Sequence, residues 1–271
     1  MAGVTVGDPR RRGSRSELPL GARRHARAVA PPPAAARGQA RAYPLKILNH
    51  HEIVNDKLGD VPIAVTYCPL CDSVAVFGRR VGERTIEFGV SGLLFNSNVL
   101  MYDRGGKPES LWSQVGAMGV SGPGARQAMK TVPVELTTWR DWQARYPKTT
   151  VLSDQTGHRR NYRVNPYQGY FNSRSLMFPV QPIDKRLPMK SPVLGVWTAE
   201  TARAYPLSAF SGNRELKQEM DGKQFTLVYN DQENTLRVES ADDGVQWMYA
   251  FWFAWHAFRP QTEVFSTQQR R

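Results

Sequence analysis

Alternating hydrophobic and polar positions, together with runs of β-branched residues, dominate this chain and predict a protein built mainly of β-strands. The runs 63–67 and 73–77 flank the tetrapeptide Cys68-Pro-Leu-Cys71, and the gap between them is too short for a crossover helix. We therefore expect a hairpin with this tetrapeptide at its tip. Other segments with a strand pattern are 85–90, 99–102, 110–114, 193–197, 225–229, 235–238 and 246–258.

Two segments follow a helical pattern instead. In 137–147 the aromatic residues share one face, a threonine can cap the first turn and a proline ends the segment. In 41–56, Pro44 suits the first turn of a shorter helix. The stretch 156–188 is aromatic but has no regular period, which predicts a loop wrapped over the sheet.

A short sequence occurs twice. Ala40-Arg-Ala-Tyr-Pro-Leu45 reappears as Ala202-Arg-Ala-Tyr-Pro-Leu207, and each copy is followed by a turn and a strand, at 82–88 and at 221–228. This repeat favours two duplicated β modules, of which the first carries the cysteine hairpin. A strand precedes the second copy, whereas Pro31-Pro-Pro precedes the first and cannot form one. The first strand of the first module is therefore expected to be missing.

Length and composition fit one domain. The chain has 271 residues, of which 41% are hydrophobic, enough for one substantial β-rich core. We predict an α+β, mostly β fold over 39–265: a hairpin-built sheet or barrel-like domain with a few short helices. Residues 1–38 are rich in Arg, Pro and Ala and read as a disordered tail, and 266–271 form a second tail.

The net charge of +12 is uneven along the chain. Residues 1–40 hold eight arginines and two acidic residues, and the excess in the remainder is expected to be spread. No basic helix or basic-aromatic stripe appears, which argues against a nucleic acid as partner. No run of eighteen apolar residues is present, so no transmembrane segment is expected, and the arginines near the start lack the apolar region of a signal peptide.

Cys68 and Cys71 are the only cysteines, and three interpretations of the pair stay open. Because a strand follows Cys71, the pair lacks the helix dipole of a thioredoxin-type site and resembles a metal-binding knuckle. With His51 as a further donor, two thiolates would suit zinc or copper. The alternatives are a redox-active dithiol and a static clasp, either a disulfide or two buried thiols.

Polar residues near the cysteines are further candidates. His51 could be a metal ligand or general base with Glu52 orienting it, or a packed core residue. Small and amide side chains lie inside apolar stretches and could line a polar pocket beside the hairpin, although such residues also serve turns and bulges. No nucleophile elbow, Ser-His-Asp order or phosphate loop occurs among them. The proposed pocket residues are Ser91, Asn96, Asn98, Asp103 and Trp112.

An ordered set of motifs over about 39–265 resembles the bacterial family named domain of unknown function 3179. They are Arg41-Ala-Tyr-Pro-Leu, the run 48–56, Thr66-Tyr-Cys-Pro-Leu-Cys71, Gly89-Val-Ser-Gly-Leu-Leu94, Leu100-Met-Tyr-Asp-Arg104, Glu109-Ser-Leu-Trp-Ser-Gln114, Pro166-Tyr167, Leu194-Gly-Val and Phe251-Trp-Phe-Ala-Trp255. The resemblance implies export, to the periplasm or the cell exterior, and no particular activity.

The sequence departs from the family pattern at three places. His50 stands where an aromatic residue is usual, Asp72 where a small residue is usual, and Asn98 where Asp is usual. Upstream of Gln39 nothing resembles the family. Together with the missing strand, this indicates a frameshift or a misplaced start, so that 1–38 is not the native frame.

Two functions follow from these observations. The first is an exported protein with a metal-binding or thiol-redox centre formed by Cys68, Cys71 and His51, acting on a metal or small molecule. The alternative is a non-catalytic binding or structural module, in which the cysteines form a disulfide clasp and the aromatic loop 161–179 contacts a partner. The residues identify neither a reaction nor a substrate.

Overall fold

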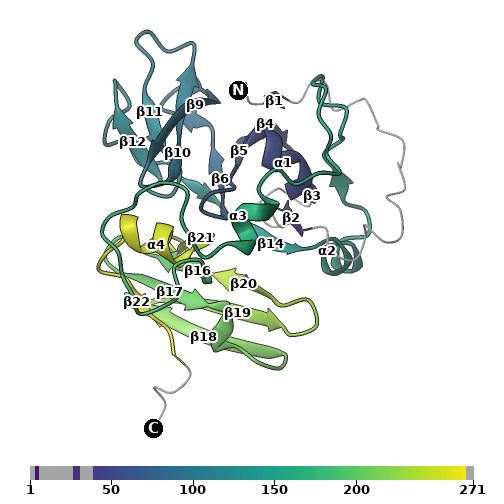
Figure 1. The fold of residues 1–271 in the computed structure, drawn as a ribbon, viewed down its shortest axis with the longest axis vertical. Helices are drawn as coiled ribbons and strands as arrows, with labels where there is room; N and C mark the ends of the chain where they lie inside the picture. Colours follow the sequence, from purple (N-terminus) through teal and green to yellow (C-terminus); the bar gives the residue numbers. More distant parts are fainter. Residues whose placement is uncertain (1–3, 6–26, 31–38, 267–271) are drawn as a thin grey trace.

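A computed structural model describes residues 4–5, 27–30 and 39–266. The described chain is mostly β, with four short helices and several open sheets (Figure 1). The predicted α+β, hairpin-built class is confirmed. None of the described sheets closes into a barrel. The predicted tails lie almost entirely outside the described residues.

The largest sheet has nine strands, in the order β1-β4-β5-β6-β21-β16-β17-β22, with β13 beside β6. These strands are β1 (Val4–Thr5), β4 (Ile53–Leu58), β5 (Val61–Cys68), β6 (Ser73–Gly78), β13 (Thr131–Val132), β16 (Pro192–Trp197), β17 (Ala202–Pro206), β21 (Gln246–Phe251) and β22 (Glu263–Val264). Strand β5 is buried on both faces, because Val65 faces one hydrophobic core and Ala64 another. This explains why its sequence is almost entirely apolar, with Thr66 as the exception.

Four smaller sheets complete the fold. Their orders are β14-β2-β3-β15, β12-β11-β10-β9, β18-β19-β20 and β7-β8. The strands are β2 (Arg27–Ala30), β3 (Arg41–Pro44), β7 (Arg80–Val81), β8 (Arg84–Thr85), β9 (Glu87–Phe95), β10 (Asn98–Arg104), β11 (Leu111–Ser113), β12 (Met118–Ser121), β14 (Glu135–Thr138), β15 (Thr150–Val151), β18 (Arg214–Met220), β19 (Lys223–Asn230) and β20 (Thr235–Ala241).

The helices are short, and all of those described except α3 directly follow a strand. They are α1 (Leu45–His51), α2 (Trp139–Arg145), α3 (Gln168–Asn172), α4 (Trp252–Phe258) and the 3₁₀ helix η3 (Leu207–Ala209). The prediction for α2 is confirmed, including the cap: the Thr138 hydroxyl accepts from the Asp141 N–H.

Two element predictions were wrong in part. The helix expected within 41–56 ends at His51, because Glu52 has a φ of 60° and the chain then enters β4, which places Asn55 on a strand. The strand expected over 246–258 becomes helix α4 after Phe251. Its run of apolar residues is buried on all sides, so the sequence has no polar positions to mark the helical period.

The repeated sequence marks a true structural duplication. The sheet order β14-β2-β3-β15 in the first copy corresponds to β21-β16-β17-β22 in the second. The registers agree as well: in the first copy Tyr43 of β3 pairs with Val29, and in the second Tyr205 of β17 pairs with Leu194. The last strand of each sheet is parallel to its neighbour, β15 to β3 and β22 to β17.

A missing first strand was predicted, and this was wrong. Strand β2 ends just before the prolines and pairs with both β3 and β14, so it occupies the place that β16 has in the second copy. Disorder was predicted for this part of the tail, and the structure instead has a strand there.

The copies also share their central hairpins, although not in the alignment expected from the sequence. The stretch 221–228 corresponds to 59–66 rather than to 82–88, because the turns before β19 and β5 match. At the far end, Cys68 pairs with Ser73 and Asn230 pairs with Thr235, so each hairpin ends in a four-residue tip, at 69–72 and at 231–234.

Each copy places its hairpin against the sheet of the other. In the first copy β6 pairs with β21 of the second, and in the second β20 lies beside β14 of the first. A hydrophobic core is therefore shared, with Val65 and Tyr67 of β5 packing in the same cluster as Leu227 and Tyr229 of β19. Residues 152–191, which include α3, connect the copies.

Candidate functional site

The cysteine pair lies where the prediction placed it, at the tip of the β5–β6 hairpin. Both thiols are free, and Cys68 and Cys71 are 1% and 0% exposed. The Cys71 N–H donates to the Cys68 carbonyl at 3.2 Å, which holds the two residues on one turn. The Ser97 carbonyl accepts from Cys71 Sγ at 3.2 Å and lies 3.9 Å from Cys68 Sγ.

The two thiols differ in acidity. Burial raises the pKa of Cys71 well above its usual range, and the hydrogen bond and charge of Cys68 raise it further. Burial also opposes ionisation of Cys68, but hydrogen bonds from the Cys71 thiol and from the N–H groups of Cys71 and Val99 outweigh burial and lower the pKa of Cys68. Cys68 is therefore the thiol that ionises first.

A buried network of polar side chains extends from the pair. The Asn98 amide hydrogen-bonds to the Cys71 thiol, which acts to lower the pKa of that thiol, and its Nδ2 donates to Gln114 Oε1 at 2.8 Å. Gln114 also accepts from Ser73 Oγ at 2.6 Å and donates to Thr66 Oγ1 at 2.9 Å. This network fixes both strands of the hairpin behind the thiols.

The cover over the thiols comes from the connection between the two copies. Tyr170 of α3 donates its hydroxyl to the Leu70 carbonyl at 2.7 Å, and Lys190 donates to the Tyr170 carbonyl at 2.7 Å. Tyr167, Phe171 and other apolar residues of this connection pack in the same cluster as the cysteines. The prediction of an aromatic loop wrapped over the sheet is confirmed.

His51 is buried at the end of α1. Its Nε2 lies 2.6 Å from the Tyr162 hydroxyl, and its ring centroid lies 5.4 Å from that of His158. Burial, followed by the charges of His158, His50 and Arg160, lowers the pKa of His51 to about 4. His51 is thus a neutral ring held by the inter-copy connection at neutral pH.

Among the residues that the structure describes, the metal interpretation lacks a third ligand. Within the described ranges no group of three or more His, Cys, Asp or Glu side chains could hold a metal ion. The Nε2 of His51 is engaged by Tyr162. The residues therefore do not fit the proposed zinc or copper centre, and the metal stays a prediction.

Glu52, considered in the sequence only as a residue that orients His51, lies close to the thiols. Its carbonyl accepts from the Tyr67 N–H at 2.7 Å, which sets Glu52 beside the end of β5. Burial raises the pKa of its carboxyl to about 7. Its charge in turn acts to raise the pKa of Cys68 and of Tyr167.

Of the five predicted pocket residues, Asn98 contacts a thiol and four serve other parts of the fold. Ser91 Oγ donates to the Leu100 carbonyl, Asn96 Oδ1 accepts from the Gln181 N–H, and Asp103 accepts from the Ser110 N–H. Trp112 is core, with its ring edge against Phe88. Hydrogen bonds of this kind stabilise turns and bulges, which was the alternative to a pocket for these residues.

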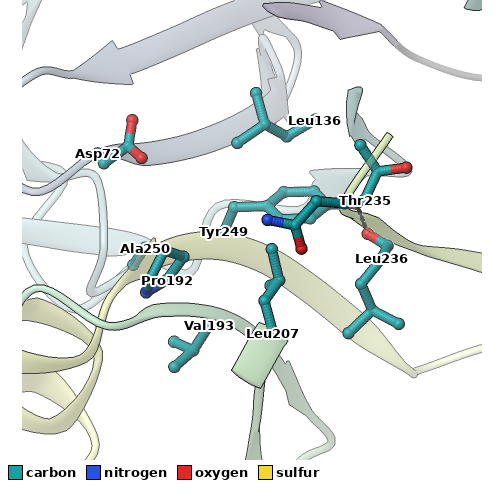
Figure 2. Close-up of a pocket in the computed structure, with 10 residues that line it drawn as sticks. Asp72, Leu136, Pro192, Val193, Leu207, Thr235, Leu236, Tyr249 and Ala250 are labelled. Carbon is teal, nitrogen blue, oxygen red and sulfur yellow. Dashed lines mark hydrogen bonds between the residues drawn. The ribbon is translucent and has the colours of Figure 1, made fainter. Parts of the chain in front are cut away.

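A small hollow opens between the two copies instead (Figure 2). Asp72 and Leu136 from the first copy face Pro192, Leu207 and other residues of the second. It has room for about one water molecule, which is too little for an organic substrate. None of the five predicted residues lines it.

Two features of the site were missed from the sequence. Gln114 was placed on a strand but not in a site, although a buried glutamine between two apolar strands requires partners. His256 is buried in α4, with Nε2 3.5 Å from Asp184. A Trp-x-x-Trp repeat at Trp139 and Trp252 was the available signal for that helix.

The comparisons identify a family. The family model described as "Protein of unknown function (DUF3179)" matches residues 34–246, most of the chain. No curated protein and no solved structure matches. No helix in the described part of the chain is long and apolar enough to cross a membrane.

Proposed function

The chain belongs to the DUF3179 family, and we propose that it carries a thiol–disulfide exchange centre formed by Cys68 and Cys71. The observation that carries the proposal is the pairing of two free thiols whose pKa values are shifted in opposite directions. A thiol of low pKa supplies the attacking thiolate, and a neighbour of high pKa stays protonated until it is needed.

The proposed reaction has two steps. Cys68, as the thiolate, attacks one sulfur of a substrate disulfide, RS–SR′. A Cys68–SR bond forms, and R′S⁻ leaves with its electron pair and takes up a proton. Cys71 then loses its proton and attacks the Cys68 sulfur, RS⁻ leaves and is protonated, and a Cys68–Cys71 disulfide remains. The protein dithiol is oxidised by two electrons and the substrate disulfide is reduced to two thiols.

Access to the thiols requires movement of their cover. Both sulfurs are buried, and Tyr170 closes over Leu70 between them. The segment 161–179 must therefore lift for a disulfide to reach Cys68. In this proposal the aromatic loop 161–179 contacts the partner, as it does in the alternative in which the cysteines form a clasp. An exported location, which the family resemblance implies, would supply disulfide substrates.

Reaction of the full chain with a neutral disulfide, dithiodipyridine, tests the proposal, with Cys68→Ser and Cys71→Ser as matched variants. Cys71→Ser should trap a mixed disulfide at Cys68, visible by intact mass. Cys68→Ser should react at least about tenfold more slowly, because only the high-pKa thiol is left. Equal rates for the two single variants would contradict the assignment of Cys68 as nucleophile.

The same samples test the alternatives. Stoichiometric zinc or copper that disappears in the Cys68→Ser/Cys71→Ser double variant would favour a metal centre over exchange. A Cys68–Cys71 disulfide that no small thiol reduces in the folded protein would favour the static clasp.

A further inference from the structure

The net positive charge of residues 41–271 is concentrated in the connection between the two copies. Residues 155–190, here called the basic segment, contain seven Lys and Arg and one acidic residue. The rest of 41–271 contains 21 basic and 21 acidic residues, which balance. The charge excess was expected to be spread over the domain, and this was wrong: all of it falls within the basic segment.

Most of these cations are exposed and unpaired. Arg159, Arg160, Arg163, Arg174 and Lys185 are exposed, and none makes an ion pair with a described residue. Arg186 alone in the segment pairs with a carboxylate, Asp184, at 2.9 Å. Cations that are neither paired nor buried project a positive potential into solvent.

The basic segment is also the cover of the dithiol. Near its start the Val164 carbonyl lies 3.2 Å from His50 Nε2, beside the end of α1. At its middle Tyr170 contacts the cysteine tip, and towards its end Arg186 stacks on Trp252 of α4 at 5.2 Å. A disulfide that approaches Cys68 must therefore meet this surface first.

We propose that the basic segment is a docking surface for an acidic polypeptide that carries the disulfide exchanged at Cys68. This inference rests on the proposed exchange function and names its substrate class. A polypeptide fits better than a small anion, because the exposed cations are distributed along the segment from Arg159 to Arg186. Exposed Met177 and Phe178 between them add apolar contact area.

Binding and exchange are measured separately. A fluorescent acidic peptide without cysteine reports docking by anisotropy, and the same peptide with an internal disulfide reports exchange. The loop variant Arg159→Glu/Arg160→Glu/Arg163→Glu is compared with a control of equal charge change, Lys130→Glu/Arg214→Glu/Lys217→Glu, whose residues are exposed and outside the segment.

The loop variant should bind the acidic peptide at least about tenfold more weakly than the wild type in about 50 mM salt, and the difference should shrink in high salt. The control should stay within about twofold of the wild type. An equal loss in both variants would show a net-charge effect and overturn the docking surface, as would unchanged binding in the loop variant.

The two proposals fail in different ways. Salt-sensitive peptide binding without exchange would support docking and remove the exchange function. Exchange at the same rate with acidic and basic peptides would keep the function and overturn the docking surface. Vesicles of anionic lipid form a third arm. If the loop variant loses binding to the vesicles while its binding to the acidic peptide is unchanged, the partner is an anionic membrane and not a polypeptide.

Discussion

The hairpin tip at 69–72 and its counterpart at 231–234 are closed by the same strand register and lie in different surroundings. In the first, the Tyr67 hydroxyl donates to Asp72 Oδ1 at 2.9 Å; in the second, the Tyr229 hydroxyl donates to Asn234 Oδ1 at 3.0 Å. Asp72 and Asn234 have φ values of 43° and 49°, in the left-handed region that Asp and Asn tolerate better than most residues. Both turns are therefore held by a tyrosine and an Asx residue.

Only the first tip carries thiols, and Leu70 and Cys71 of that tip are buried, whereas three residues of the second tip, Asp231, Gln232 and Asn234, are exposed. Glu233 occupies the position of Cys71 in the second copy, where it accepts from Thr138 and pairs with Arg140. The second copy thus forms the corresponding turn with a carboxylate in place of a thiol, and the Glu233 side chain is 8% exposed. The hairpin therefore does not need cysteines for its shape, which leaves their chemistry as the reason for a buried, covered pair.

The largest expected effect tests whether the copies are equivalent in the core. Trp142 of α2 and Trp255 of α4 are both fully buried, and each donates from Nε1 to a threonine seven residues later at 2.9 Å. Replacing either with Ala should lower the free energy of unfolding by about 3–5 kcal/mol. Urea denaturation measures this. A loss below about 1 kcal/mol for one of them would break the equivalence.

A pH effect should be specific to the first copy. Glu52 lies beside Tyr67, where the second copy has Arg214 beside Tyr229. Because burial raises the pKa of Glu52 to about 7 from 4.5, the folded state keeps a proton that the unfolded chain releases. The stability that this proton contributes is present in full below about pH 4.5 and is lost as the pH rises to about 7.

Glu52→Gln should remove this pH-dependent loss of stability, because a glutamine side chain does not titrate. Relative to the wild type, the variant should gain about 2 kcal/mol of stability between about pH 5 and about pH 8. Denaturation at the two pH values gives the difference, with Arg214→Gln as the matched variant in the second copy. The same pH dependence in wild type and Glu52→Gln would show that the carboxyl titrates normally.

The smallest effect separates the two tyrosine bonds. Tyr67→Phe removes a hydrogen bond to a carboxylate and should cost about 2 kcal/mol, whereas Tyr229→Phe removes one to an amide and should cost about 1 kcal/mol. Paired denaturation curves measure both. The reverse order would mean that the Asp72 charge contributes nothing to the first tip.

Local patterns predicted the elements whose signals are local. Alternation of apolar residues predicted the cysteine hairpin, and a capping threonine helped to predict helix α2. The lack of a regular period predicted the aromatic loop. The sequence repeat at Tyr43 and Tyr205 indicated the duplication, but its register depended on pairing partners far away along the chain, such as Thr150 for Arg41. The role of Gln114 was missed for the same reason: Thr66 and Ser73, its partners, are brought to it only by the folded sheets.

The mode of connection between the copies has one further consequence. Because each hairpin lies against the sheet of the other copy, the two halves are interlocked by strand pairing and a common core, independently of residues 152–191. The stretch that covers the thiols is therefore not needed to hold the two copies together. A single proteolytic cleavage at one of its exposed arginines would leave the two halves associated and would release the cover over Cys68 and Cys71.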